Sequence, residues 1–321
     1  GNTVCKFRNP TAYTNYMLEK YINPTPQTSV GNPIYYVAKT GSDANNGSKN
    51  KPFLTIQKAV DSIGDASGII TLLDSEWYRE AVNVTSNANV TIQSARDKRA
   101  KIVGSDKLVL TKSNSYTKVY QASLATKPVG MGGARGKPMI AEWGTPSSHI
   151  APEDIHHLQR GEAYRLPYTE MYEVASIADV EANDGTWFWQ DGVIYLSATD
   201  GSDATAKQYE ARVRPTLNHS GGKLSMYRMD LMFSNSYGFY STGIAVYRED
   251  CRAYSNYHNG FADYANSTVA YRDIALKNGN DGINGTVSSY DTENLTTATQ
   301  ATYFDPYGAL NGDDGISYHI R

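Results

Sequence analysis

Short runs of apolar residues, separated by polar turn residues, recur along the last third of the chain. Three of them, at 224–233, 244–254 and 268–277, are rich in β-branched and aromatic residues, and Asn, Ser and Gly connect them. Each repeat begins with Tyr-Arg and ends with a glycine followed by an apolar residue, and these glycines lie 22 residues apart: Gly238, Gly260 and Gly282. A fixed period in the low twenties predicts a solenoid, in which each repeat buries its apolar side chains against its neighbours.

The same runs decide between types of solenoid. They show no helical periodicity and lack the regular leucines of a leucine-rich repeat, while their connectors contain Gly and Asn, which accept positive φ. We therefore predict a parallel β-helix, with strands stacked repeat on repeat. A β-sandwich with regularly spaced strands is the alternative.

The pattern in the N-terminal half also predicts strands, with one helix among them. Strand-like runs occupy 35–37, 68–73, 81–84, 89–93 and 101–103. In 55–63, four apolar residues recur at helical spacing and form one face: Ile56, Ala59, Val60 and Ile63. Such a helix is expected to cap the open end of the solenoid, which needs a cap for solubility.

Residues 115–222 interrupt this pattern. The segments 119–124 and 186–201 read as antiparallel hairpin pieces, and Gln190-Asp191-Gly192 is typical of a hairpin turn. Trp187 and Trp189 face the same side of a strand, and we favour a buried hydrophobic face for them over a sugar-binding platform. The predicted organisation is an N-terminal arm (1–33), the cap and first repeats (34–114), an inserted antiparallel β-rich subdomain (115–222) and the remaining repeats (223–321).

Residues 34–63 read IYYVAKTGSDANNGSKNKPFLTIQKAVDSI. An aromatic strand, Gly-Ser-Asp, an Asn/Gly turn, Lys-Pro-Phe, Thr-Ile-Gln and a short helix follow one another in this segment. It resembles the entry segment of right-handed β-helix proteins that act on polysaccharides, among them phage tailspikes and pectate-lyase-like enzymes. The resemblance implies a right-handed parallel β-helix, a polysaccharide as partner, a homotrimer as in tailspikes, and a place in a virion tail or outside the cell.

Composition narrows the possible partners. The net charge of −3 and the lack of a basic stripe argue against nucleic acid, and no apolar run is long enough to predict membrane insertion. Cys5 and Cys251 match no metal or redox spacing, so we expect two free thiols. The chain ends on SYHIR, which reads as the middle of a strand, so we expect further chain or a partner to cover it.

Acidic residues gather at one position of the repeat. The two residues before the recurring glycine are Ser236-Tyr237, then His258-Asn259, then Asn280-Asp281, and finally Asp313-Asp314 before Gly315. Because neighbouring strands lie about 5 Å apart, Asp281 is expected close to Asp313 or Asp314. His258 would lie one repeat away, and His319 just downstream.

Two or three carboxyl groups this close have a chemical use. Like charges oppose each other's ionisation, which leaves one proton donor and one base or nucleophile, the pair that glycoside hydrolysis needs. The same cluster suits Ca²⁺ if the enzyme is a lyase; otherwise we expect no cofactor. The alternative is that Asp281, Asp313 and Asp314 only shape turns, as Asp-Gly and Asn-Gly commonly do.

The last repeat is longer than the others. Gly282 and Gly315 lie 33 residues apart, which is one repeat plus an insertion of eleven. We expect 285–312 to loop outward and to wall a groove beside the acidic residues. This segment carries aromatic and acidic residues suited to a glycan: Tyr303, Phe304, Asp305 and Tyr307.

These features together predict a tailspike-like depolymerase that binds and cleaves a bacterial surface polysaccharide. Asp281, Asp313 and Asp314 are the predicted acid, base and nucleophile set, with His319 supporting them. The residues predicted to contact substrate are Tyr303, Phe304, Asp305, Tyr307 and His258. A Ca²⁺-dependent polysaccharide lyase and a non-catalytic glycan-binding or structural fibre are the alternatives.

Overall fold

The computed structural model describes residues 32–130, 139–143, 168–287, 300–304, 306–309 and 311–320. The chain divides into two compact units, Gly1–Asn32 and Pro33–Arg321, and the description below concerns the second. Within the described residues its regular elements are strands apart from two short helices, α2 (Ile56–Ile63) and α3 (Ile177–Ala182), and one 3-10 turn, Ala204–Ala206. The all-β class is therefore confirmed. No helix in the described ranges is long and apolar enough to cross a membrane.

Three parallel sheets hold most of the strands. The first consists of β1 (Ile34–Val37), β2 (Gly68–Leu72), β5 (Asn89–Ser94), β16 (Lys223–Tyr227), β19 (Ala245–Glu249), β22 (Ser267–Tyr271) and β25 (Gln300–Phe304). The second consists of β3 (Trp77–Tyr78), β6 (Ala100–Val103), β17 (Met229–Met232), β20 (Arg252–Tyr254), β23 (Ile274–Leu276) and β26 (Tyr307–Ala309). The third consists of β4 (Val82–Val84), β15 (Leu217–His219), β18 (Phe239–Ser241), β21 (Phe261–Asp263), β24 (Ile283–Val287) and β27 (Ile316–Ile320).

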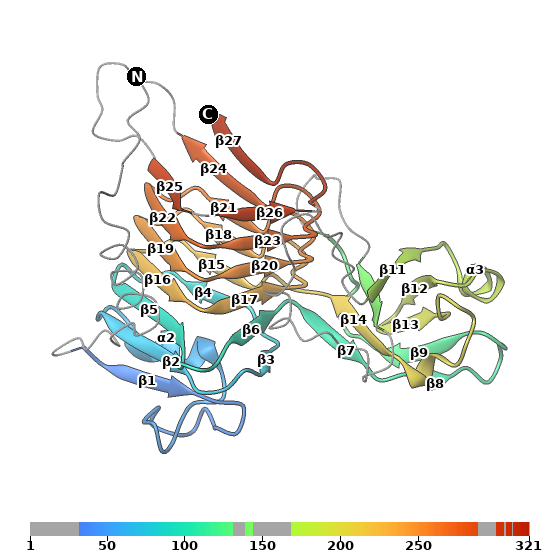
Figure 1. The fold of residues 1–321 in the computed structure, drawn as a ribbon. Coiled ribbons are helices and arrows are strands. Elements are labelled where there is room, and N and C mark those ends of the chain that lie inside the picture. The colour runs from blue at the N-terminus through green and yellow to red at the C-terminus, as the bar shows by residue number, and fades with distance from the viewer. Residues whose placement is uncertain are drawn as a thin grey trace. The chain divides into compact units, whose positions relative to one another are not determined.

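The chain passes through these sheets in the same order in every repeat. From β16 to β27 it runs through the first, second and third sheet in turn, and each strand pairs in parallel with its equivalent in the next repeat (Figure 1). The pairing advances by one sequence period, so equivalent apolar residues of the third sheet lie side by side in one core: Leu217, Phe239, Phe261 and Ile283. The predicted stacking of strand on strand is confirmed.

The bends between the first and second sheets take a left-handed backbone without glycine. Arg228, Asp250 and Arg272 have φ values of 53°, 54° and 53°. The Tyr-Arg pair of the middle repeat is not structurally equivalent to the other two, because Asp250 occupies this bend there. Arg248 instead lies within β19, where the alternation of a strand turns its side chain inward.

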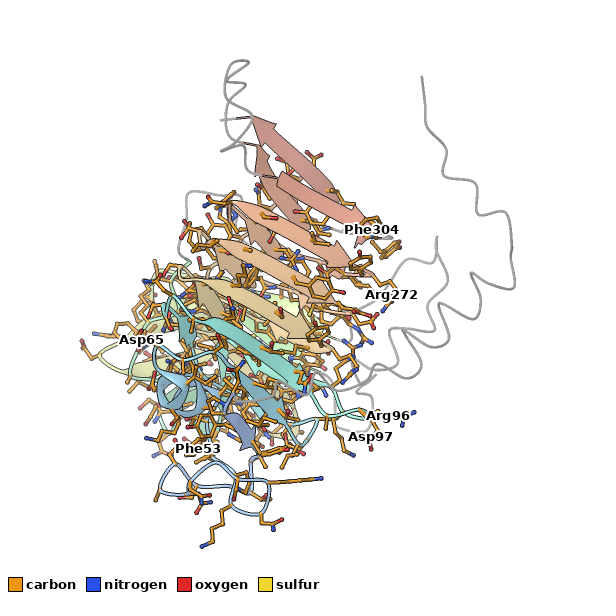
Figure 2. All side chains as sticks on the ribbon, turned by 90° about the vertical axis from the view of Figure 1, so that its left-hand side faces the viewer. Phe53, Asp65, Arg96, Asp97, Arg272 and Phe304 are labelled. Atoms are coloured by element: carbon orange, nitrogen blue, oxygen red, sulfur yellow. The ribbon has the colours of Figure 1, made fainter. Side chains whose placement is uncertain are left out.

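Helix α2 forms where the sequence predicted it. The Thr55 side chain caps its N-terminus by accepting a hydrogen bond of 3.2 Å from the N–H of Lys58. Its four predicted apolar residues are buried and join the core that the three sheets share. Figure 2 labels Phe53, near this helix, and Phe304, on the last strand of the first sheet, toward opposite ends of the stack.

A fourth sheet of eight strands lies within residues 105–212, whereas the sequence predicted an inserted subdomain at 115–222. Its order is β7 (Ser105–Leu108), β14 (Gln208–Arg212), β10 (Ile140–Trp143), β11 (Tyr168–Glu173), β12 (Thr186–Gln190), β13 (Val193–Leu196), β9 (Tyr120–Ser123) and β8 (Thr111–Lys112). The pairs are antiparallel except β11 with β12. The predicted hairpin turn is confirmed, with positive φ at Asp191 and Gly192. Trp187 is buried in this sheet's own core, as favoured from the sequence.

An ion network lies inside the stack of parallel sheets. Arg248 donates through Nε to Asp273 Oδ2 at 2.7 Å and through Nη2 to Asp263 Oδ2 at 2.8 Å, and its Nη1 also bonds Asp263. All three side chains are fully buried. The guanidinium carbon lies 4.3 Å from the ring centre of Phe261, so aromatic rings complete its surroundings.

The network gives one carboxyl group an unusual titration. Burial raises the pKa of Asp273 to about 6, and the charge of Asp263 adds to this, although Arg248 acts in the opposite direction. The folded protein therefore holds a proton on Asp273 at pH values where the unfolded chain, with an ordinary pKa near ~3.9, does not.

The free energy of unfolding should therefore decrease as the pH rises from about 4 to 6, because the folded protein loses the proton on Asp273 over this range. We expect the difference in unfolding free energy between wild type and Asp273→Asn to shrink by about 2–3 kcal/mol over that window. Urea titrations of both proteins at several pH values measure it. A difference that stays constant with pH would contradict the assignment.

Candidate functional site

The turns that enter the third sheet stack in register. Each recurring glycine donates its backbone N–H to the residue that precedes the next glycine: Gly238 to Asn259 at 3.0 Å, Gly260 to Asp281 at 3.0 Å and Gly282 to Asp314 at 2.8 Å. The predicted equivalence of Asn259, Asp281 and Asp314 is therefore confirmed. These turns bring the candidate carboxyl groups onto neighbouring strands, about 5 Å apart in the stacking direction.

The recurring glycines are needed for close approach rather than for positive φ. A Cβ on Gly260 would lie 2.5 Å from the carbonyl oxygen of Gly282, and one on Gly282 would lie 2.5 Å from that of Gly315. Neither residue has a positive φ. The period of 22 residues marks the places where the backbones of successive turns touch.

Asp281 is enclosed and hydrogen-bonded. The residue is only 1% exposed to solvent. Oδ2 accepts hydrogen bonds from Ser317 Oγ at 2.8 Å and from Asn284 Nδ2, and Oδ1 accepts one of 3.4 Å from the backbone N–H of Asp314. The structure thus brings Asp281 and Asp314 together through a contact between side chain and backbone.

Asp313 and Asp314 stand in different surroundings from Asp281, because both are exposed. The backbone N–H of Asp313 bonds the carbonyl oxygen of Asn280 at 3.2 Å, which continues the stack of turns. His319 belongs to β27 and pairs with Thr286, but its side chain lies outside the described part of the structure. One enclosed and two exposed acidic residues therefore lie on consecutive turns at this end of the third sheet.

His258 lies one repeat before Asn280, as predicted. Its carbonyl oxygen accepts the N–H of Asn280 at 3.2 Å, and its Nδ1 lies 2.7 Å from Asn259 Oδ1. The imidazole ring also packs on Tyr237, with ring centres 4.6 Å apart. His258 thus links the acidic turns to a group of tyrosines.

The predicted wall of the groove is not one outward loop. Residues 300–304 and 307–309 form the regular strands β25 and β26, and the extra residues of this repeat fall between β24 and β25, outside the described ranges. Tyr303 points into the stack, where its hydroxyl donates to Asp263 Oδ2 at 2.7 Å. The expected excursion over 285–312 is therefore wrong, because the chain resumes its strand pairing before Tyr303.

The other predicted substrate contacts occupy different places. Phe304 is 46% exposed on the outer side of the first sheet and stacks on Tyr271 with ring centres 4.5 Å apart. It lies near Arg272 in Figure 2. Tyr307 lies on β26 in the second sheet, and Asp305 lies outside the described residues. These residues do not gather beside Asp281.

A row of four residues in register on the third sheet escaped the sequence prediction. Asn218, Tyr240, Ala262 and Asn284 are in register on neighbouring strands. The signal was present in the sequence, because these four positions recur every 22 residues. The last three of them follow the recurring glycines by two residues. Tyr240 packs against Tyr237 and Tyr264, with ring centres 5.1 and 5.6 Å apart.

The described residues contain no group of three or more His, Cys, Asp or Glu side chains placed to hold a metal ion. Cys251 is buried and free, and burial raises the pKa of its thiol well above the ordinary range. Cys5 lies outside the described ranges.

Comparisons with known proteins relate the chain to others through its fold. No family model matches it, and no curated protein matches it. A solved structure described as the complex of XylC with xylose is similar with a TM-score of 0.60 and 14% identity, covering 90% of this chain and 57% of that one. This chain therefore spans little more than half of that relative.

Two further solved structures are more distant. A chain described as a glycoside hydrolase has a TM-score of 0.46 and 11% identity, covering 86% of this chain and 70% of that one. A rhamnogalacturonan lyase has a TM-score of 0.31 and 11% identity, covering 87% of this chain and 58% of that one. The structural neighbours are thus carbohydrate-active proteins, at identities that concern the fold alone.

Proposed function

We propose that this protein is a polysaccharide-cleaving enzyme built as a right-handed parallel β-helix, similar to the depolymerases of phage tailspikes. The repeated passage through three parallel sheets supports the β-helix, and so does the resemblance of 34–63 to the entry segment of such proteins. The similarity of fold to XylC, whose structure holds xylose, favours a sugar substrate. In this proposal the protein acts as a homotrimer on a virion tail or outside the cell.

The observation that carries the proposal is the pair of unlike carboxyl groups on consecutive turns, Asp281 enclosed and Asp314 exposed. Two carboxyl groups in different surroundings divide the roles of acid and base in glycoside hydrolysis. Asp281 would give its proton to the leaving glycosidic oxygen as the C–O bond breaks. Asp314 would take a proton from the water whose oxygen forms the new bond to the sugar. Asp313 and His319 would support the pair.

A non-catalytic glycan-binding fibre is the second candidate, and one observation favours it. Asp281 Oδ1 accepts the N–H of Asp314 just as Asn259 Oδ1 accepts the N–H of Asp281, at 3.1 Å. Asp281 thus makes the same turn-stabilising bond as Asn259 one repeat earlier, and this bond accounts for a polar side chain at the position without a catalytic role. The fibre would bind a glycan through the tyrosines near His258, which are Tyr237, Tyr240 and Tyr264, and would leave the glycan intact.

Incubation with a set of glycans separates these functions. Wild-type protein would be mixed with bacterial capsular polysaccharides, lipopolysaccharide O-chains and xylan, and the products would be weighed by mass spectrometry. A hydrolase yields fragments that have each gained one water. Fragments without added water that absorb in the ultraviolet would indicate a lyase, and intact glycan in every mixture would favour the fibre.

A further inference from the structure

Three residues of the stacked turns form a column that reaches solvent. The backbone N–H of Asn280 bonds the carbonyl oxygen of His258 at 3.2 Å, and the N–H of Asp313 bonds that of Asn280 at 3.2 Å. His258 and Asn280 are half-buried and Asp313 is exposed. Successive members lie about 4.8 Å apart, the spacing of neighbouring strands. We call His258, Asn280 and Asp313 the turn column.

The amide of Asn259 fixes which nitrogen of His258 carries a proton. Asn259 Oδ1 accepts the backbone N–H of Asp281 at 3.1 Å. Because a backbone N–H can only donate, this atom is the oxygen of the amide and not its nitrogen. His258 Nδ1 lies 2.7 Å from the same oxygen and must therefore be the protonated nitrogen. In the neutral imidazole the lone pair is then on Nε2.

This lone pair is held in a fixed direction and is open to solvent. The hydrogen bond to Asn259 and the packing of the imidazole on Tyr237, with ring centres 4.6 Å apart, restrain the ring on two sides. No residue in the described part of the chain bonds Nε2, and this atom is not buried. An acceptor restrained in this way loses little conformational freedom when a ligand donates to it.

The open groups of the turn column suit a ligand that donates hydrogen bonds. Neutral His258 offers the lone pair of Nε2, and the carboxylate of Asp313 only accepts hydrogen bonds. Asn280 donates through Nδ2 to Asn259 Oδ1 at 3.0 Å, and its own Oδ1 has no partner among the residues described. Sugar hydroxyls are donors of this kind. A single sugar placed over Asn280 would direct hydroxyl groups toward both His258 and Asp313.

Aromatic rings continue from the turn column on the side of His258. Tyr237 also packs on Tyr240, with ring centres 5.1 Å apart, and Tyr240 stands edge-on to Tyr264 at 5.6 Å. All three tyrosines are half-buried. Apolar rings beside a few fixed polar groups are typical of binding sites for ligands that, like sugars, have both C–H and hydroxyl surfaces.

Charge favours a sugar without a carboxylate. The turn column contains no Lys or Arg, and Asp313 and Asp314 are both exposed on its last turn. Lys277, the basic residue nearest to Asn280 in sequence, has its Nζ 3.9 Å from the ring centre of Tyr168. A carboxylate bound over Asn280 would stand within a screening length of about 10 Å of like charges, with no cation in the column to offset them.

We infer that His258 and Asn280 form a sugar-binding subsite beside the acidic turns, in which His258 Nε2 accepts a hydrogen bond from a hydroxyl of an uncharged sugar. The inference rests on the proposed function for its glycan and adds a binding residue of defined tautomer and the class of sugar. In this subsite His258 binds the substrate, and proton transfer stays with the acidic pair.

Nitrogen NMR of histidine-labelled protein at about pH 8, where histidine is ordinarily neutral, tests both the tautomer and the binding. The signals of His258 are those that His258→Asn lacks. We expect a protonated Nδ1 and an unprotonated Nε2, and we expect Nε2 to shift when xylobiose, cellobiose or maltose is added but not with digalacturonate. A proton on Nε2 in place of Nδ1, no shift with any of the neutral disaccharides, or a shift with digalacturonate alone would overturn the inference.

Variants separate the binding group from the turn. His258→Asn keeps an N–H near the position of Nδ1 for the bond to Asn259 and removes Nε2. The fold should therefore survive, while the affinity for the neutral disaccharide falls about tenfold, the effect of one lost hydrogen bond. Asn280→Ala should have a similar effect, and Asn218→Ala is its matched control, because Asn218 is a half-buried amide on β15 outside the turn column.

The outcomes for the subsite and for the hydrolase are distinguishable. Wild-type affinity in His258→Asn, or equal losses in the two alanine variants, would refute the subsite. If a disaccharide binds through His258 but no glycan is cleaved, the subsite survives and the proposed hydrolase fails. If a glycan is cleaved and His258→Asn cleaves it with the KM of the wild type, the hydrolase survives and the subsite fails.

Discussion

Replacement of Arg248 by methionine should lower the free energy of unfolding by about 3–5 kcal/mol, because it leaves buried charges without their partner. Arg248 is fully buried and is the cation that the buried carboxylates of Asp263 and Asp273 share. Burial by itself would lower the pKa of the guanidinium, but the two aspartates raise this pKa well above its ordinary value. The methionine fills most of the volume but cannot compensate either carboxylate.

Chemical denaturation of the variant and of Arg272→Met measures the effect against a matched control. Arg272 also pairs with two carboxylates, Glu249 and Asp250, but it lies at an outer bend and its side chain is 25% exposed. We expect the control to lose about 1 kcal/mol or less, as surface ion pairs do. Adding Asp263→Asn and Asp273→Asn to Arg248→Met should recover part of the loss, because the uncompensated charges disappear. Equal losses for the two single variants would contradict the buried network.

Regular features of the chain were predictable because each has a period. Helix α2 follows from four apolar residues at helical spacing, and the strands of the third sheet follow from the recurrence of Gly238, Gly260 and Gly282. The glycines succeeded as markers for a reason that the sequence does not display. They are required where the backbone of one turn touches the next, which only the folded arrangement reveals.

Irregular features were missed where two residues of the same kind occupy different positions. Tyr247-Arg248 reads like Tyr227-Arg228, but it lies two residues earlier in the repeat. Because of this shift, Arg248 points inward from β19 and does not occupy a bend. The partners of Arg248 follow at 15 and 25 residues along the chain. No local pattern connects them, because the contacts depend on how the turns stack.

In the candidate site, too, residues that follow the period were predicted correctly and a residue next to the insertion was not. Asp281, Asp314 and His258 were placed correctly relative to one another, because all three belong to the turn that repeats. Tyr303 was misplaced, since an insertion of known length does not say where within the repeat the extra residues fall. The strands β25 and β26 resume the register after it and turn Tyr303 toward Asp263.

Asp281→Asn should abolish most glycan cleavage while leaving the fold intact, with an expected loss of about 10²- to 10⁴-fold in kcat for a missing general acid. The amide keeps an oxygen to accept the N–H of Asp314, as Asn259 does for Asp281. The new N–H groups can meet an acceptor, because Asn284 Oδ1 has no hydrogen-bond partner within the described part of the chain and can turn toward them. We expect the free energy of unfolding to change by about 1 kcal/mol or less.

Asp281→Ala and Asn259→Ala complete the comparison. Each removes a side chain that accepts a backbone N–H of the next turn, so both should cost about 1–3 kcal/mol of stability. Only the first also removes a carboxyl group. Catalysis by Asp281 requires that Asp281→Asn and Asp281→Ala be equally inactive while Asn259→Ala still cleaves the glycan. If Asp281→Asn cleaves at the wild-type rate and only the alanine variants lose stability, Asp281 shapes the turn and the proton donor must be sought among the exposed carboxyl groups.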